Sequence, residues 1–158
     1  MANADIANGF TPVRTKGGVE PRTTHYFVHS SETIEIGDAV LLSGGFLTIG
    51  LAGSTSLLGV AAEAVDVAST DPTDRDRLMV YDDPEQQFKG QASGSYTEQT
   101  DGVITADIEG ATGVMEINEN ATSTEVVKIL GRIPTADNAD GANANLLFKI
   151  NKHQLDGE

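Results

Sequence analysis

Short segments with alternating apolar and polar residues, separated by glycine-rich turns, are the feature that most constrains how this chain folds. Residues 46–51 (FLTIGL) alternate in this way, and in residues 145–150 (NLLFKI) Leu146, Phe148 and Ile150 fall on one face. A period of two residues is typical of a β-strand that lies with one face on a core. No segment carries a convincing long helical period. The sequence therefore predicts an all-β protein, a compact β-barrel or sandwich of short strands.

The last of these segments follows a loose run of small and polar residues, 135–144 (TADNADGANA). A free tail would gain nothing from one apolar and one polar face. We therefore predict that residues 145–150 form a strand that closes the barrel and covers an edge that would otherwise be open.

The first 24 residues show no apolar periodicity of either kind. They contain three glycines and two prolines, which disfavour helices and interrupt strand ladders: Gly9, Pro12, Gly17, Gly18 and Pro21. We predict an extended N-terminal arm over residues 1–24, ordered only where something else holds it, and a single β-barrel-like domain over residues 25–158.

The charge of the chain excludes one class of partner and divides the sequence in two. The formal net charge is −14, so the chain should repel nucleic acid and anionic membranes. Residues 1–24 carry three basic and two acidic side chains, a net +1, which leaves −15 for the rest. Two interpretations stay open: an acidic surface that aids solubility, or a basic arm that docks on an acidic partner.

Several classes of site and targeting signal have no support in the sequence. The chain has no cysteine, which excludes disulfides, zinc thiolate sites and a thiol nucleophile. No run of 18 apolar residues is present, and residues 1–10 lack the pattern of a signal peptide. We expect a protein that is made in a cytoplasm and has no membrane partner.

The candidate metal ligands have unfavourable spacings. His25 and His29 share a face of a strand but would lie ~13 Å apart, at ~3.3 Å per residue, too far for one zinc ion. The carboxylates of residues 71–76 and 82–85 lack the spacing of a calcium-binding loop, so a chance cluster is the favoured interpretation. No nucleophile elbow or phosphate-binding loop is present. We therefore expect no enzyme activity, metal or cofactor.

Five segments in order resemble a known family. The chain is similar to the capsid decoration proteins of tailed bacteriophages, which are also called cement or head-stabilising proteins. The resemblance spans nearly the whole chain, although residues 90–110 are shorter and more acidic than the family pattern. It is carried by MANADIANGFTPVR (1–14), IGDAVLLSGG (36–45), LLGVAAEAV (57–65), LMVYDDPEQQFKGQ (78–91), and VVKILGRI (126–133) with DNADGANANLLFKINKHQ (137–154).

The resemblance implies a structural protein of the virion. Such a protein is a β-barrel, often a homotrimer, that sits on the outer surface of the capsid and stabilises it by bridging neighbouring major capsid subunits. In this chain the arm would make the contact, with apolar residues buried in niches and basic residues paired with acidic capsid groups: Phe10, Pro12, Val13, Arg14, Lys16 and Arg22. The partners would be the major capsid protein and further copies of the chain.

Two other classes of function stay open. One is a virion surface module that binds host glycans, although the chain has no tryptophan and few aromatic residues. The other is a head-completion or tail-tube subunit, which would assemble into a ring. A glycan array tests the first, and the mass of the oligomer tests the second.

Overall fold

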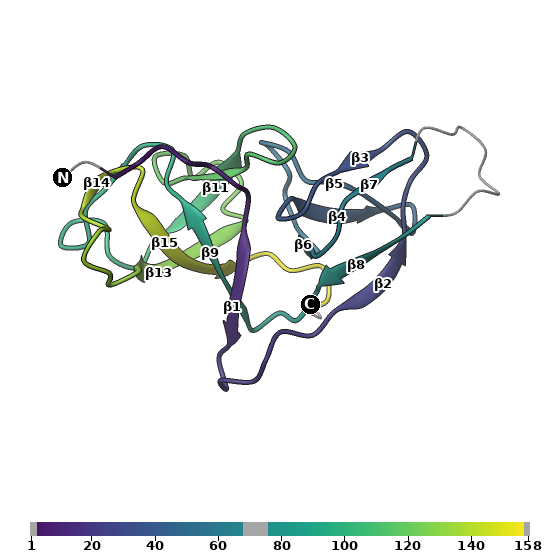
Figure 1. Ribbon diagram of the computed structural model, residues 1–158, viewed down its shortest axis with the longest axis horizontal. Helices are drawn as coiled ribbons and strands as arrows, with labels where there is room; N and C mark the ends of the chain where they lie inside the picture. The colour runs from purple at the N-terminus through teal and green to yellow at the C-terminus, as the bar shows by residue number, and fades with distance from the viewer. Residues whose placement is uncertain (1–2, 68–75, 157–158) are drawn as a thin grey trace.

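A computed structural model describes residues 3–67 and 76–156 of the chain (Figure 1). These residues form strands, turns and loops with no helix among them, and the strands make four antiparallel sheets. The prediction of an all-β fold is confirmed. The strands are β1 (Thr11–Thr15), β2 (Thr24–Phe27), β3 (Thr33–Ile34), β4 (Ala39–Ser43), β5 (Phe46–Ile49), β6 (Gly59–Ala61), β7 (Val65–Asp66), β8 (Arg77–Tyr81), β9 (Gln86–Gln91), β10 (Ser95–Tyr96), β11 (Thr105–Glu109), β12 (Glu116–Asn118), β13 (Val127–Arg132), β14 (Gly141–Ala142) and β15 (Asn145–Ile150).

The larger sheet has six strands in the order β1-β9-β15-β13-β11-β12. The strand predicted at residues 145–150 is β15, and Leu146, Phe148 and Ile150 are buried on its inner face as expected. Its predicted place was wrong, because it does not close a barrel. It lies between β9 and β13 and pairs with both, so it covers two strand edges in the interior of the sheet.

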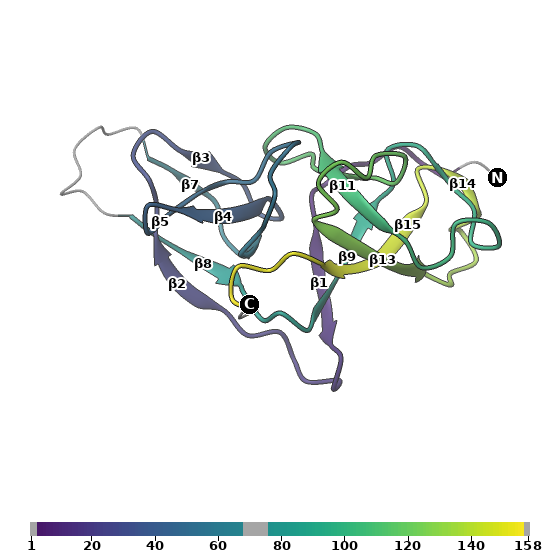
Figure 2. The same cartoon turned by 180° about the vertical axis from the view of Figure 1, so that it is seen from behind.

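The second sheet has five strands in the order β2-β8-β6-β4-β5 and encloses its own group of buried side chains. Figures 1 and 2 show the two sheets as two halves of the molecule that lie side by side. The described chain thus has two hydrophobic clusters, where the sequence indicated one barrel. Ile49 packs against both clusters, so the halves share a continuous contact.

The two halves repeat one topology. With β1 left aside, each sheet has five strands, which can be numbered in the order in which they occur along the chain. Both sheets then have the spatial order first, fifth, fourth, second, third: β2-β8-β6-β4-β5 and β9-β15-β13-β11-β12. The small ribbons β3–β7 and β10–β14 fall at the same places in the two series, between the first and second and between the fourth and fifth strands. Only β1 has no counterpart among the described strands.

The repeat extends to the way each sheet curls. The third strand returns to the end of the first through one parallel bridge, Leu47 with Val28 in one half and Ile117 with Ala92 in the other. The residue after each bridge donates its backbone N–H to the third strand, at 2.8 Å from His29 and 2.9 Å from Ser93. A single bridge does not make a continuous hydrogen-bonded pairing between the first and third strands. In the described part of the chain, each half is therefore a curled sheet and not a closed barrel.

The junction of the halves depends on close backbone contact and one buried carboxylate. The Phe10 N–H donates to the Gly37 carbonyl at 2.7 Å, and a Cβ at Gly9 (φ 70°) would lie 2.8 Å from the same oxygen. Asp38 accepts the N–H of Glu35 at 2.9 Å and that of Gly113 at 2.7 Å, which ties the five-stranded half to the turn before β12. Burial raises the pKa of Asp38.

Candidate functional site

Five of the six N-terminal residues predicted to contact a partner lie in or beside β1, which is an edge strand of the six-stranded sheet. β1 pairs antiparallel with β9, with a register shift between Pro12 and Arg14. Residue 24 is therefore not a boundary between an arm and a domain, since residues 10–15 belong to the sheet and its core. The chain then leaves β1 through a turn at residues 16–18, which projects from the body of the molecule (Figure 1).

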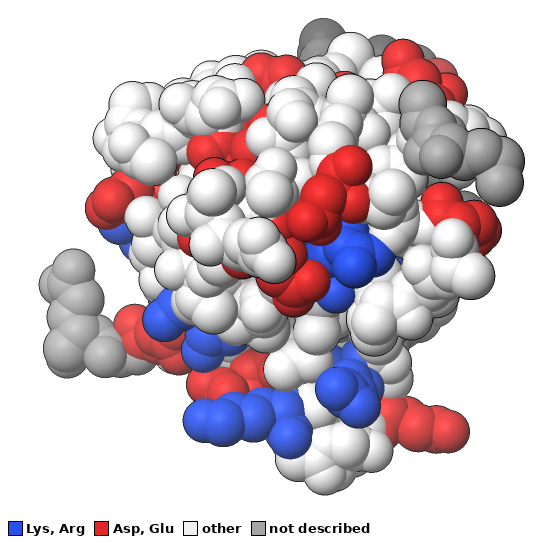
Figure 3. Space-filling model, turned by 90° about the vertical axis from the view of Figure 1, so that its left-hand side faces the viewer, with Lys and Arg blue, Asp and Glu red and all other residues white. Residues whose placement is uncertain are grey.

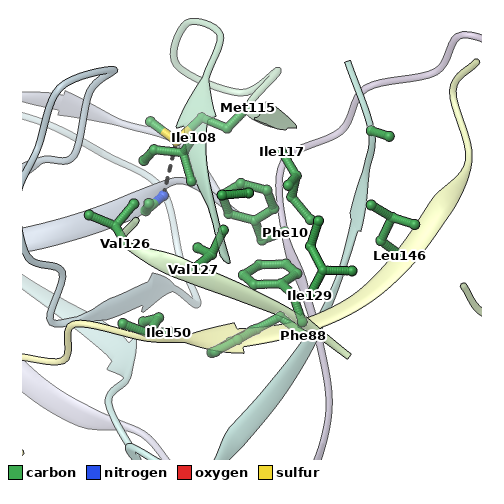
Figure 4. Packing of buried hydrophobic residues seen from close by; sticks show 14 of the residues in the cluster. Phe10, Phe88, Ile108, Met115, Ile117, Val126, Val127, Ile129, Leu146 and Ile150 are labelled. Atoms are coloured by element: carbon green, nitrogen blue, oxygen red, sulfur yellow. Dashed lines mark hydrogen bonds between the residues drawn. The ribbon is translucent and has the colours of Figure 1, made fainter. Parts of the chain in front are cut away.

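Phe10 does not face a partner. Its side chain is 2% exposed and lies among the buried side chains of the six-stranded half (Figure 4). The Phe10 ring meets the Phe148 ring edge-on, at 4.9 Å between centroids. Gly90 on β9 leaves the space, because a Cβ there would lie 2.8 Å from the Phe10 ring. The expectation that Phe10 inserts into a capsid niche is wrong for this structure, since its own core holds it.

The other predicted residues are accessible but do not form one cluster. Pro12 aligns with Phe88 and is half-buried, while Val13 lies in the bulge with 44% of its surface exposed. Arg14 is exposed and its Nε lies 3.4 Å from Oε1 of Gln87. Lys16 is exposed at the turn. Arg22 lies apart from them, at a groove beside β2 and the end of β8.

The strand register adds basic residues that the sequence pattern did not reveal. Across the sheet, Arg14 aligns with Gln87, Gln87 with Lys149, and Lys149 with Lys128. Lys89 lies two residues along β9 on the same face, because side chains of a strand alternate between faces. The opposite face holds the buried Phe88, Phe148 and Ile129. We call Arg14, Lys16, Lys89, Lys128 and Lys149 the basic face.

The basic face differs from the rest of this acidic chain. Figure 3 shows several blue side chains over the lower part of this side of the molecule, with red side chains beside them. Lys149 pairs with Glu85 at 3.3 Å. Within residues 3–67 and 76–156, the other four basic side chains of this face have no carboxylate within 4.0 Å. An anionic partner could therefore contact these four side chains without breaking an ion pair.

Two other basic residues, Arg132 and Lys152, are already paired. Arg132 lies 2.9 Å from Asp140 and 3.9 Å from Glu98, and its guanidinium also donates to the Asn138 carbonyl. Lys152 lies 4.0 Å from Glu125 and donates to the carbonyl of Thr124 at 2.5 Å. These two side chains hold loops in place and are poor candidates for contacts with a partner.

Asp107 is a buried carboxylate with a structural role, because it accepts several hydrogen bonds from the loop before β13. Burial alone would raise the pKa of Asp107, but hydrogen bonds from the Ser123 hydroxyl and the backbone N–H groups of Thr124 and Glu125 lower it far below its usual range. The Ser123 hydroxyl lies 2.6 Å from Asp107 Oδ2. These contacts fix the loop that leads into β13.

The described residues hold no group of three or more potential metal ligands. His25 and His29 lie on and just after β2, and His153 is buried near the C-terminus. Of the carboxylate cluster, Asp71 and Asp74 fall outside the described residues, while Asp82 accepts the Tyr26 hydroxyl at 2.5 Å. No helix in the described chain is of a length and apolarity that would cross a membrane.

No protein-family model matches the chain, and a search of curated proteins finds no relative.

Proposed function

We propose that this chain is a structural virion protein that binds the outer surface of a tailed-phage capsid and cements neighbouring major capsid subunits. The sequence resemblance motivates the proposal, and the basic face is the structural observation that carries it. The outer face of the six-stranded sheet and the turn after β1 present four basic side chains that have no carboxylate within 4.0 Å among the described residues, in a chain with a net charge of −14. Such a surface suits an acidic patch on a protein lattice, because the remaining negative charge opposes binding to nucleic acid.

The contact would combine charge with apolar anchoring. Val13 is exposed in the bulge beside Arg14 and supplies an apolar contact at the rim of the basic face. Exposed ion pairs contribute only ~0–1 kcal/mol each, so several must act together. A decoration protein that touches more than one capsid subunit gains from this, since each later contact forms at a high effective concentration.

Binding to capsids tests the proposal. The purified protein would be co-sedimented with expanded capsids that lack it, over a series of salt concentrations. We expect Lys89→Gln with Lys128→Gln to weaken binding and to reduce its salt dependence, because screening acts on exposed pairs over ~10 Å at 0.1 M salt.

The matched control is Arg77→Gln with Lys152→Gln, which makes the same change in net charge away from the basic face; its circular dichroism spectrum must match that of the wild type, because Lys152 also donates to the Thr124 carbonyl. The control should bind like the wild type. No capsid binding by the wild-type protein, or equal losses for both double variants, would contradict the proposal.

A further inference from the structure

The two halves of the molecule differ in what covers their first strand. In the six-stranded half, β9 lies between β15 and β1. Its counterpart β2 pairs with β8 alone and forms an edge of the five-stranded sheet. The repeat thus shows that this strand position accepts a neighbour, and in the five-stranded half the described chain supplies none.

The backbone groups on the open edge of β2 follow from the ladder. The Val28 N–H donates to the Asp76 carbonyl at 3.0 Å, so Val28 faces β8. Alternate residues of an antiparallel strand direct their backbone groups to the same side, so Thr24 also faces β8. The N–H and C=O groups of Thr23 and His25 therefore point away from β8, towards solvent.

The counterpart half shows the same geometry with the edge filled. There Gln87 and Lys89 occupy the positions of Thr23 and His25, because Phe88 pairs with Phe148 as Thr24 pairs with Val80. Gln87 and Lys89 align with residues of β1. A strand that added to β2 would use the equivalent groups.

The edge of β2 lacks the devices that usually block strand addition. β1, the outer strand of the other half, carries Pro12 and a bulge, both of which disrupt an edge. Residues 23–27 (TTHYF) contain no proline, lysine or carboxylate and consist of residue types that favour strands. An uncharged, regular edge of this kind is suited to pairing.

We propose that this edge pairs with the same edge of a second copy of the chain, antiparallel, with Thr24 opposite Thr24. In this register Thr23 of each copy meets His25 of the other. Each such pair exchanges two backbone hydrogen bonds through the groups that point to solvent. The two five-stranded sheets then form one continuous sheet across a two-fold axis.

Charge complementarity favours a second copy as the occupant. The register places Arg22 of each copy opposite Tyr26 of the other, on the face where Asp82 accepts the Tyr26 hydroxyl at 2.5 Å and the Thr24 hydroxyl at 3.1 Å. Arg22 of one copy can thus reach Asp82 of the other. The receiving groove, of about 500 Å³, is lined by Arg22, Thr23, Thr24, Asp82, Asp83, Pro84 and Leu155.

This contact forms twice by symmetry and offsets the repulsion between two chains of net charge −14. It does not depend on the capsid-binding proposal, since the basic face lies on the other half of the molecule. It is also separate from the trimer that the sequence resemblance implies.

Sedimentation of the full chain over a concentration series tests the proposal. We expect a dimer at high concentration. His25→Pro removes one outward N–H per copy and should weaken dimerisation by about tenfold or more, while His25→Thr keeps the N–H and should leave it intact. Circular dichroism would show that both variants are folded.

Two further measurements do not depend on proline. Arg22→Glu should weaken the dimer, because it places a carboxylate beside Asp82. In hydrogen exchange, the His25 amide should gain protection as the wild-type concentration rises.

Three results would overturn the proposal. The first is a wild-type protein that stays monomeric at every concentration. The second is an oligomer that neither His25→Pro nor Arg22→Glu weakens. The third is a His25 amide that gains protection only on capsids, which would assign the edge to a strand of the capsid protein.

Discussion

Replacing Phe10 by alanine tests whether the N-terminal segment is part of the folded core. The Phe10 side chain is 2% exposed, contacts the ring of Phe148 and lies in the hydrophobic core of the six-stranded half. Truncation of a buried phenylalanine costs about 3–5 kcal/mol, through the lost burial and the cavity that remains. We expect the upper part of this range, because the T-shaped contact with Phe148 is lost as well, at about 0.5–1.5 kcal/mol.

Urea and thermal unfolding would measure the effect. For a domain of this size, a loss of 3–5 kcal/mol lowers the melting temperature by roughly 6–20 °C. Val13→Ala is the matched control, because Val13 is 44% exposed on the same strand and its truncation should change the unfolding free energy by only about 0.5 kcal/mol. If Phe10→Ala unfolds like the wild type while Val13→Ala also has no effect, the segment is a loosely attached arm and our reasoning fails.

Three further changes probe the core, the C-terminal tail and the loop before β13. Phe148→Asp should unfold the protein, because it buries an unpaired charge, whereas Lys149→Asp should keep the wild-type circular dichroism spectrum; two equally stable variants would contradict the placement of β15. Burial lowers the pKa of His153, whose Nδ1 accepts the Leu155 N–H at 3.0 Å. The imidazole of His153 therefore binds a proton more readily in the unfolded chain than in the folded one, so the free energy of unfolding should fall as the pH drops below about 6.5. His153→Gln should make the free energy of unfolding, measured with urea between pH 7 and 5, less dependent on pH. Asp107→Asn should lower the free energy of unfolding by about 2–3 kcal/mol at pH 7, because an amide cannot accept hydrogen bonds from all the donors of the loop. This difference from the wild type should shrink in strong acid, where Asp107 itself becomes protonated. A difference that does not change with pH would show that the charge of Asp107 has no part in it.

The sequence was most informative where a strand has one buried face. The alternation in residues 145–150 predicted β15 with the bounds that the structure has, because three apolar side chains on one face dictate which side meets the core. It could not predict that β15 lies inside the sheet. The neighbours of a strand depend on the path of the whole chain, and here β9 and β13 come from different segments.

The burial of Phe10 could not be predicted from the sequence, because the segment around it has no regular alternation of apolar and polar residues. β1 is held mainly by backbone pairing with β9, and one large apolar side chain carries its contact with the core. Gly90 was a usable signal, since a glycine inside a strand often marks a close approach by another part of the chain. The residue that fills the space lies 80 positions earlier, and only the fold connects the two.

The basic face was missed for a related reason. Lys89, Lys128 and Lys149 each occur as a single lysine opposite the apolar face of a strand, which is ordinary in a soluble protein. Their alignment follows from the strand order β9-β15-β13, which no local pattern contains. The same limit hid the repeat of the two halves, because equivalent positions share strand register while pairs such as Thr24 and Phe88 differ in residue type and in burial.

One pair of equivalent positions explains how a repeated topology gives two halves with different surfaces. Gly90 and Tyr26 occupy the same place, on the first strand of each half. Gly90 leaves room for the ring of Phe10, so β1 can lie along β9 and anchor in the core. Tyr26 instead carries a ring that packs against the core of the five-stranded half, and its hydroxyl donates to Asp82. A strand that adds to β2 can therefore use backbone pairing and charge but no buried aromatic anchor, which makes β1 a permanent part of the fold and the edge of β2 suited to a reversible contact.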